Sequence, residues 1–439
     1  MKRIVICCDG TWNEPDHNEQ GKPCPTNVVK LASLIPAMAD DGTAQRVFYH
    51  NGIGSMASRT KRLIDGATGY GISRILLSCY AWLVRTYQPG DQLYFFGFSR
   101  GAYTARSLTG FVRNSGILRT EHESLIPDAF ALYRSRDGTR APRSEASRLF
   151  RQSYAWSDST PIQCVGVWDT VGSLGVPNTL FQGILKHLFR VNREFHDTDL
   201  SSSVAFAFHA VAIDEHRKPF LPTLWTLPKG QGAGQHVEQC WFPGCHADVG
   251  GGNPDSGLSA VALEWMVARA RLAGLAVDDP FRLVPPGFPP HHPDPLGPVS
   301  ESQTLFYRLF GSGERAIDVP HPAGRTNEGL SDAAIERWHK LPEWRYRARW
   351  SIWCIASPES RHIAASPMIA WIASAACSTA TSQPNAISVP IRMKPSNCRA
   401  KIMARQSATI MPRKMPNTPT RKVWAFSATA ANSSRATIP

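Results

Sequence analysis

A serine between two glycines is the residue of this chain best suited to nucleophilic catalysis. Residues 92–96 form a short apolar and aromatic run, which is typical of a buried parallel strand. The motif GFSRG follows at 97–101, and apolar residues then recur at helical spacing. A G-x-S-x-G motif between a strand and a helix forms a strained turn that exposes the serine at the helix N-terminus. We therefore take Ser99 as the candidate nucleophile; the alternative is that it only caps the helix.

An aspartate and a histidine that lie later in the chain are suited to activate such a serine. The apolar run 162–168 ends in Asp169, and an acid at the end of a strand can orient a histidine and stabilise its protonated form. An aromatic run then leads into a glycine-rich loop that carries His246, which can act as the general base for Ser99. Asp248 is the alternative acid, but it would have to fold back onto His246, so we prefer Asp169. A purely structural Asp169 would hydrogen-bond its own turn.

Backbone N–H groups can stabilise the oxyanion of this reaction. The apolar run 3–8 reads as the first strand and ends in Asp9, Gly10 and Thr11, at the edge where α/β sheets bind ligands. Gly10 and Thr11 would form one half of an oxyanion hole, and the N–H of Arg100 would form the other. The alternative is a turn capped by Asp9. A cation held by Asp9 and Asp248 is a weaker hypothesis, because nothing beyond two carboxylates supports it.

Two other segments have both a structural and a functional interpretation. His209 lies in an apolar, helix-like run at 204–215, where a lone histidine is more often structural than part of a site. Residues 180–191 place apolar side chains on one helical face and basic side chains on the other. Such a segment usually faces a core, and the alternative is a lid or a helix that rests on a membrane surface.

The remaining pattern predicts the elements that would position these residues. Helices are expected at 27–38, 75–87, 258–270 and 330–338, and a further strand at 46–50. This order of strands and helices indicates an α/β fold with a mostly parallel sheet, helices on both faces, and inserted loops and helices. The Pro- and His-rich stretch 275–300 reads as a loop and not as a metal site, because prolines flank its adjacent histidines.

The net charge of +13 is concentrated in the tail of the chain. Residues 351–439 contain eleven Lys and Arg against one acid, whereas the preceding 350 residues contain 37 basic against 34 acidic residues. The tail also has no Leu, Gly, Asp or Tyr, and it shows no periodicity. We interpret 348–439 as a disordered basic arm or, preferably, as the product of a shift of reading frame near residues 346–350. The catalytic domain is then expected at 1–347.

No stretch reads as a targeting or membrane-spanning segment. The first apolar run is too short for a signal peptide, and the longest apolar run of the tail is too short to cross a bilayer. The ten cysteines show no C-x-x-C spacing, which favours synthesis in a reducing cytoplasm. Secretion by a route that needs no signal peptide remains compatible with this sequence.

These segments together resemble an α/β-hydrolase domain family of bacterial and fungal proteins of unknown function, which includes type VI secretion phospholipase effectors. The resemblance covers roughly residues 1–347 and preserves the order Ser, Asp, His of α/β-hydrolases. It rests on the segments DGTWN at 9–13, GFSRGAY at 97–103, GVWDTVG at 166–172, HA at 209–210 with IDE at 213–215, and WFPG at 241–244 with HADVGGG at 246–252.

The resemblance implies an α/β-hydrolase fold and a serine triad of Ser99, Asp169 and His246. Because characterised relatives are phospholipases, it implies a lipid ester as substrate, with possible contact to a membrane surface. Neither a metal nor an organic cofactor is needed for this acyl-enzyme chemistry, and no specific nucleic-acid partner is expected. The alternatives are a soluble carboxylesterase or thioesterase, and a non-catalytic truncated product whose basic tail binds nucleic acid or anionic lipid.

Overall fold

The computed structural model describes residues 1–10, 18–19, 21–52, 69–135, 137–171, 200–227, 234–281, 288, 290–302, 312–317 and 326–345. Within these ranges, seven parallel strands form the central sheet in the order β4-β1-β5-β6-β7-β8-β9. The strands are β1 (Arg3–Cys8), β4 (Gln45–His50), β5 (Gln92–Phe98), β6 (Ile162–Trp168), β7 (Val204–Ala212), β8 (His236–Phe242) and β9 (Glu328–Leu330). The predicted α/β class with a parallel sheet is confirmed.

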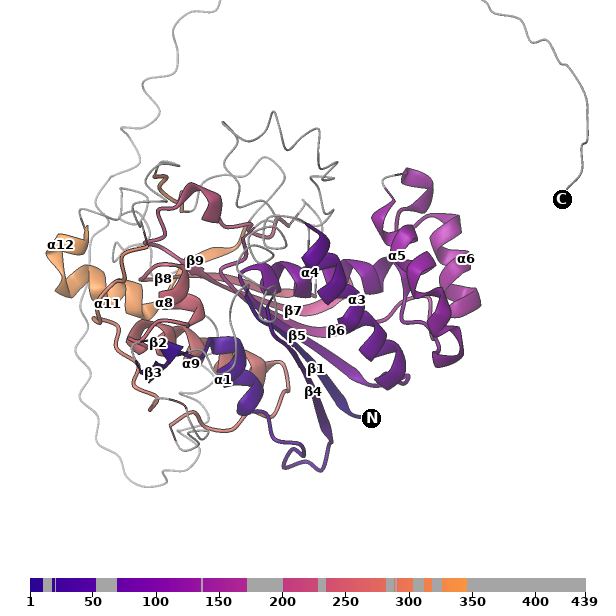
Figure 1. Ribbon diagram of the computed structural model, residues 1–439, viewed down its shortest axis with the longest axis horizontal. Helices are drawn as coiled ribbons and strands as arrows, with labels where there is room; N and C mark the ends of the chain where they lie inside the picture. The colour runs from indigo at the N-terminus through magenta and orange to yellow at the C-terminus, as the bar shows by residue number, and fades with distance from the viewer. Residues whose placement is uncertain are drawn as a thin grey trace, which may run out of the picture. The chain divides into compact units, whose positions relative to one another are not determined.

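Helices cover both faces of this sheet (Figure 1). One face packs against α3 (Gly69–Thr86), α4 (Arg100–Ser115) and α5 (Ile126–Arg134). The other face packs against α1 (Asn27–Ser33) and α9 (Gly257–Leu272). Parallel strands that are covered on both faces are apolar along their whole length, as the sequences of β1 and β5 are.

Side chains of the central strands alternate between the two cores. In β1, Ile4 and Ile6 belong to the core beneath α3 and α4, whereas Val5 and Cys7 belong to the core beneath α1 and α9. All four are fully buried. Burial of a side chain such as Ile or Val contributes about 1.5–3 kcal/mol relative to exposure, so this alternation fixes the strand between its helices.

The strand register aligns the carboxyl ends of the central strands. Cys8 of β1 lies opposite Gly97 of β5, and Phe98 of β5 lies opposite Trp168 of β6. Trp168 in turn lies opposite Ala210 of β7. The residues that follow β1, β5 and β6 therefore meet at one edge of the sheet, where ligands of α/β folds bind.

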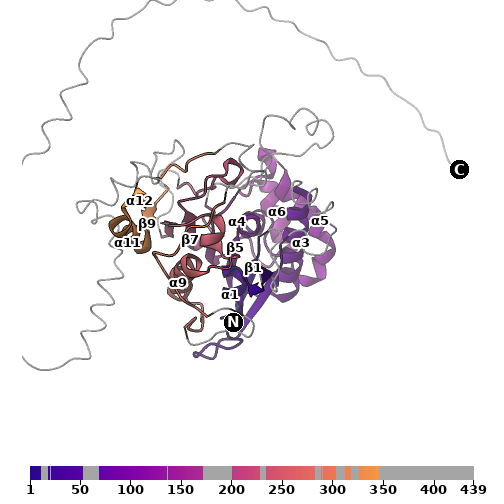
Figure 2. The same ribbon diagram turned by 60° about the vertical axis from the view of Figure 1, so that its left-hand side comes forward.

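Smaller elements complete the described part of the chain. Figures 1 and 2 both draw α5 and α6 beside α3, and α11 and α12 together near β9. A short antiparallel pair joins β2 to β3. These elements are β2 (Asn18–Glu19), β3 (Lys22–Pro23), η1 (Thr120–Leu125), η2 (Gly138–Arg140), α6 (Glu145–Tyr154), η3 (Lys218–Phe220), α8 (His246–Gly250), α11 (Asp332–Lys340) and α12 (Pro342–Arg345).

Three expectations about individual elements were wrong. The run that begins at 204 was read as helix-like but is strand β7, because an apolar stretch that is buried on both faces lacks a diagnostic period. The helix expected at 330–338 starts at Asp332, after Leu330 has ended β9 and Ser331 has capped the helix. The helix expected at 27–38 ends at Ser33, shortly before Pro36.

The far edge of the sheet has its own small core. Trp241 of β8, Leu330 of β9 and Ala334 of α11 pack together with Trp344 of α12. The Nε1–H of Trp344 donates to Asp214, beyond the end of β7, at 2.9 Å.

None of the helices in the described ranges is both long and apolar enough to cross a bilayer. The segment 348–439 lies outside the described residues, so the domain boundary at 347 stays a prediction.

Candidate active site

The predicted turn at Ser99 joins β5 to α4 with a strained backbone. Ser99 has a φ of 58° and a ψ of −120°, and its N–H donates to the carbonyl of Trp168 at 3.0 Å. A positive φ in a residue other than glycine costs about 1–3 kcal/mol and is found mainly at functional sites. The Ser99 side chain makes no capping hydrogen bond to α4, although Ser99 occupies the N-cap position. A capping role for its hydroxyl therefore has no support here.

The two glycines of the motif are required by close contacts between backbones. A Cβ on Gly97 would lie 2.4 Å from the carbonyl oxygen of Gly101. A Cβ on Gly101 would lie 2.1 Å from the carbonyl oxygen of Cys8. Any larger residue at either position would push α4 away from β5 or from the end of β1. The glycines thus set the position of Ser99 at the edge of the sheet.

His246 and Asp169 form a buried pair at the same edge. The Nδ1 of His246 lies 2.5 Å from Oδ2 of Asp169. Because a carboxylate accepts, Nδ1 is the donor of this contact. The imidazole packs against the rings of Phe98 and Phe220, with ring centroids 4.6 and 5.0 Å away. Phe98 immediately precedes Ser99, so this packing brings His246, the first residue of α8 and not part of a loop as expected, to the serine turn.

The Asp169 carboxylate is held by four hydrogen bonds. Besides His246, the backbone N–H of Ala212 donates to it at 3.0 Å, and two nitrogens of Arg315 donate at 2.5 and 2.9 Å. Burial of Asp169 opposes its ionisation, but the positive charge of Arg315 and the contact with His246 outweigh burial. Together they hold the pKa of this carboxyl well below its usual range. Asp169 is therefore ionised at neutral pH.

Arg315 is the residue of this cluster that sequence reasoning missed. It lies in the short described segment 312–317, which has no helix or strand and no recognisable motif. Its side chain is only 1% exposed. No signal in a single sequence distinguishes this arginine from the other basic residues, because the contact depends on how the chain returns to the sheet edge.

Asp248, the alternative acid, binds elsewhere. Its carboxylate accepts from the backbone N–H groups of Cys245 and Ser300, each at 2.9 Å. It also accepts from the side chains of Asn253 and Ser300, each at 2.7 Å. These bonds tie the first turn of α8 to neighbouring loops, while the ring of His246 contacts Asp169.

Asp9 stabilises the turn after β1. One of its carboxylate oxygens accepts from the N–H of Gly10 at 2.7 Å. The other accepts from the hydroxyls of Thr26 and Tyr49 at 2.6 and 2.8 Å. The Gly10 contact is the one expected if Asp9 caps a local turn. Thr11 lies outside the described residues. In the ranges that the structure describes, no three His, Cys, Asp or Glu side chains gather as metal ligands.

His209 lies in the middle of the sheet, on β7, and is fully buried. Burial and the nearby charge of Arg106 lower the pKa of its imidazole to about 3. The neutral ring accepts from the N–H of Thr170 through Nε2 and donates from Nδ1 to Gln239, both at 3.1 Å. Since Thr170 follows Asp169, His209 supports the strand end that carries the acid.

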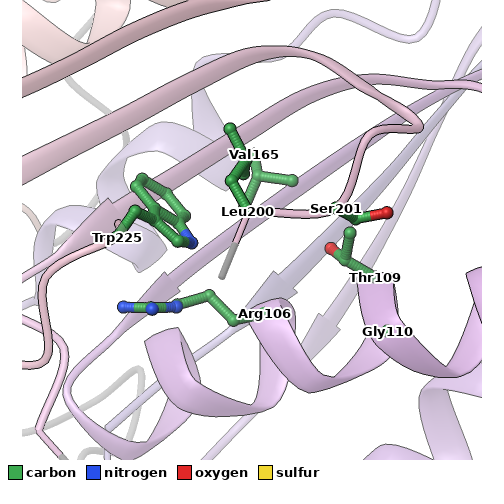
Figure 3. Close-up of a pocket in the computed structure, with 7 residues that line it drawn as sticks. All are labelled: Arg106, Thr109, Gly110, Val165, Leu200, Ser201 and Trp225. Atoms are coloured by element: carbon green, nitrogen blue, oxygen red, sulfur yellow. The ribbon is translucent and has the colours of Figure 1, made fainter. Parts of the chain in front are cut away.

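A small pocket lies further along α4. Figure 3 shows the Arg106 side chain extending from α4 toward Trp225, and the centre of the guanidinium lies 4.8 Å from the centre of the indole ring. The pocket contains none of Ser99, Asp169 and His246. It is lined by Arg106, Thr109, Gly110, Val165, Leu200, Ser201 and Trp225.

The amphipathic segment 180–191 lies outside the described residues, so its lid or membrane role is not addressed by the structure.

Several known proteins are similar to this chain. A family model described as "T6SS, Phospholipase effector Tle1-like, catalytic domain" matches residues 2–269. Uncharacterized protein YEL023C of Saccharomyces cerevisiae is 28% identical over 255 residues, which is 52% of this chain and 34% of that protein. The chain thus spans about a third of the length of this relative. A crystal structure of an uncharacterized protein from Pseudomonas aeruginosa aligns with a TM-score of 0.38 and 19% identity, over 65% of this chain and 48% of that one.

Proposed function

This chain belongs to the family of type VI secretion phospholipase effectors with a Tle1-like catalytic domain, and on this premise we propose that it is a serine hydrolase of lipid esters. Ser99 is the proposed nucleophile, His246 the general base and Asp169 the acid that orients it. The observation that carries this proposal is the buried 2.5 Å contact between His246 and Asp169, with the His246 ring packed on Phe98, the residue before the strained Ser99.

The proposed reaction proceeds through an acyl-enzyme. Nε2 of His246 takes the proton of the Ser99 hydroxyl as Oγ attacks the ester carbonyl. Asp169 accepts from Nδ1 and stabilises the imidazolium that forms. His246 then gives the proton to the leaving alcohol. In the second half, His246 deprotonates a water that attacks the acyl carbon, and it returns the proton to Oγ of Ser99 as the bond between Ser99 and the acyl group breaks.

The oxyanion would be held by backbone N–H groups. Arg100 is the first residue of α4, so its N–H lies at the positive end of the helix dipole, next to the nucleophile. We propose it as one donor and the turn of Gly10 and Thr11 as the other. Because the N–H of Gly10 donates to Asp9 in this structure, its participation requires that it be shared with the oxyanion.

The proposed substrate class follows from the family. A phospholipase family implies a lipid ester, and residues 180–191 are the proposed contact with a membrane surface. A soluble carboxylesterase or thioesterase is the outcome to expect if only short soluble esters are cleaved.

The test is hydrolysis of phospholipid vesicles and of a soluble short-chain ester by the full chain. Ser99→Ala is expected to lower kcat by about 10³-fold or more on both, because the nucleophile acts as a unit with its base. The matched control is Ser33→Ala, an exposed serine whose hydroxyl bonds only within α1, which should keep wild-type activity. Wild-type activity in folded Ser99→Ala would refute the assignment of Ser99 as the nucleophile.

A further inference from the structure

We propose that Arg315 is a positioning residue of this site, whose guanidinium shares the Asp169 carboxylate with His246. The proposal rests on the assignment of Ser99, His246 and Asp169 above. It goes beyond that assignment because it adds a positive charge to the buried core of the site.

The contact between Arg315 and Asp169 is bidentate. Nη1 of Arg315 donates to Oδ1 at 2.5 Å, and Nη2 donates to Oδ2 at 2.9 Å. The same two nitrogens donate to the backbone carbonyls of Ala212 and Phe220. Two parallel bonds from a planar guanidinium fix both the position and the rotation of a carboxylate. The plane of the Asp169 carboxylate, and with it the direction of the bond to His246, is thereby set.

The segment that carries Arg315 is itself fastened to the turn after β7. The N–H of Gly313 donates to the carbonyl of His216 at 2.8 Å. Ser312 forms an isolated bridge with Arg217. The arginine therefore comes from a held backbone, and from a part of the chain beyond residue 269, where the match to the family model ends.

The shared carboxylate changes the charge that His246 faces. Oδ2 of Asp169 accepts from both His246 and Arg315. An isolated buried carboxylate would strongly favour the imidazolium, because opposite charges attract strongly in a low dielectric. With Arg315 in place, the pair of acid and arginine has no net charge. The charge of Arg315 thus opposes the attraction that Asp169 exerts on an imidazolium.

The other charged groups near His246 are engaged with partners of their own. Glu215 accepts from the backbone N–H of His246 at 3.3 Å and forms an ion pair with Arg217 at 2.7 Å. The guanidinium of Arg217 lies over the ring of Phe220, 3.7 Å from its centroid. Asp248 is bound by loop donors, as described above. Among the residues that the structure describes, Arg315 is thus the cation that directly contacts the acid on which His246 depends.

The experiment compares Arg315→Met and Arg315→Lys with the wild type in the full chain. The titration of His246 is followed by NMR of ¹³C-labelled imidazoles, with the signal assigned by its loss in His246→Gln. The acidic limb of the kcat/KM profile is measured on the ester that the wild type cleaves. Arg269→Met removes a comparable arginine, paired with Glu238 at 3.0 Å, and serves as the matched control.

In Arg315→Met, the His246 titration and the acidic limb are expected to move upward by about one pH unit, since a neighbouring cation is lost. Arg315→Lys keeps the positive charge but loses the bidentate guanidinium. The acidic limb of its kcat/KM profile should therefore stay at the wild-type pH, while kcat falls several-fold. Arg269→Met should change neither. Unchanged titration in folded Arg315→Met overturns the proposal. If that variant does not fold, a wild-type kcat in Arg315→Lys overturns it instead.

The NMR titration separates this proposal from the assignment of the nucleophile. It needs no turnover, so it can support a role of Arg315 even if Ser99→Ala retains activity. Conversely, loss of activity in Ser99→Ala with an unshifted titration in Arg315→Met would retain the serine hydrolase and discard the positioning role.

Discussion

Replacement of Gly101 by alanine tests whether close packing of α4 sets the position of Ser99. The added Cβ would lie 2.1 Å from the carbonyl oxygen of Cys8 and 2.5 Å from that of Asp9. Real Cβ atoms do not approach backbone atoms so closely, and neither atom belongs to a flexible side chain. The helix must therefore move away from the end of β1, by an amount on the order of 1 Å if ordinary contact distances are restored.

This displacement carries a cost in stability and a larger one in activity. Overpacking of a well-packed core typically costs 1–3 kcal/mol, and a clash between two backbones belongs at the upper end, so we expect about 3 kcal/mol. A shift of about 1 Å in a catalytic group can lower kcat by about 100-fold. Gly101→Ala should thus lose activity even at temperatures where it is folded.

The assay combines urea unfolding, monitored by tryptophan fluorescence, with a measurement of ester hydrolysis at 15 °C. Gly138→Ala is the matched control, because a Cβ on Gly138 meets no atom within 4 Å. It should leave both readouts close to wild type. If Gly101→Ala matched Gly138→Ala in unfolding midpoint and in kcat, the contact between α4 and β1 would not set the position of Ser99, and the argument would fail.

Three further outcomes are expected. Asp169→Asn should lower kcat by about 10⁴-fold because an amide favours the wrong histidine tautomer, whereas Asp248→Asn should mainly lower the free energy of unfolding, measured by urea titration. The pKa of His209 is lowered to about 3 in the folded protein, so the unfolded chain takes up this proton at a higher pH than the folded chain does. The free energy of unfolding should therefore fall as the pH decreases from about 6.5 toward 3. His209→Gln should flatten this pH dependence, as measured by urea titrations at several pH values. Tyr49→Phe removes a hydroxyl that donates to the buried Asp9 carboxylate and should cost about 1.5–3 kcal/mol of unfolding free energy.

Local patterns were sufficient to predict the elements that carry the serine and the acid. Strand β6 has the predicted bounds, because an apolar run between polar turns has few alternatives. The strand and helix around Ser99 were also predicted, since GFSRG requires a sharp turn at that point. The structure then brings His246 to Asp169, as expected from the position of each residue at a strand end.

Features that depend on long-range contacts were not predictable from one sequence. β7 resembles a buried helix by composition, and only its neighbours β6 and β8 make it a strand. Arg315 contacts Asp169 across 146 residues of chain, and no local pattern encodes that distance. The hydrogen bond from Gly10 to Asp9 depends on the rotation of a single side chain, which a turn motif does not specify.

Because of the order of the strands, the ribosome makes the residues of the proposed site at different times. From β6 onward, each strand of the central sheet pairs with the one synthesised before it. A nascent chain that has passed β6 already contains the strained serine and the acid, but it lacks His246, and Arg315 follows only some seventy residues later still. The proposed hydrolytic machinery is thus incomplete until the far edge of the sheet has emerged. On the proposed assignment, a cell that makes this chain would meet a competent hydrolase only after the segment 312–317 has closed on Asp169.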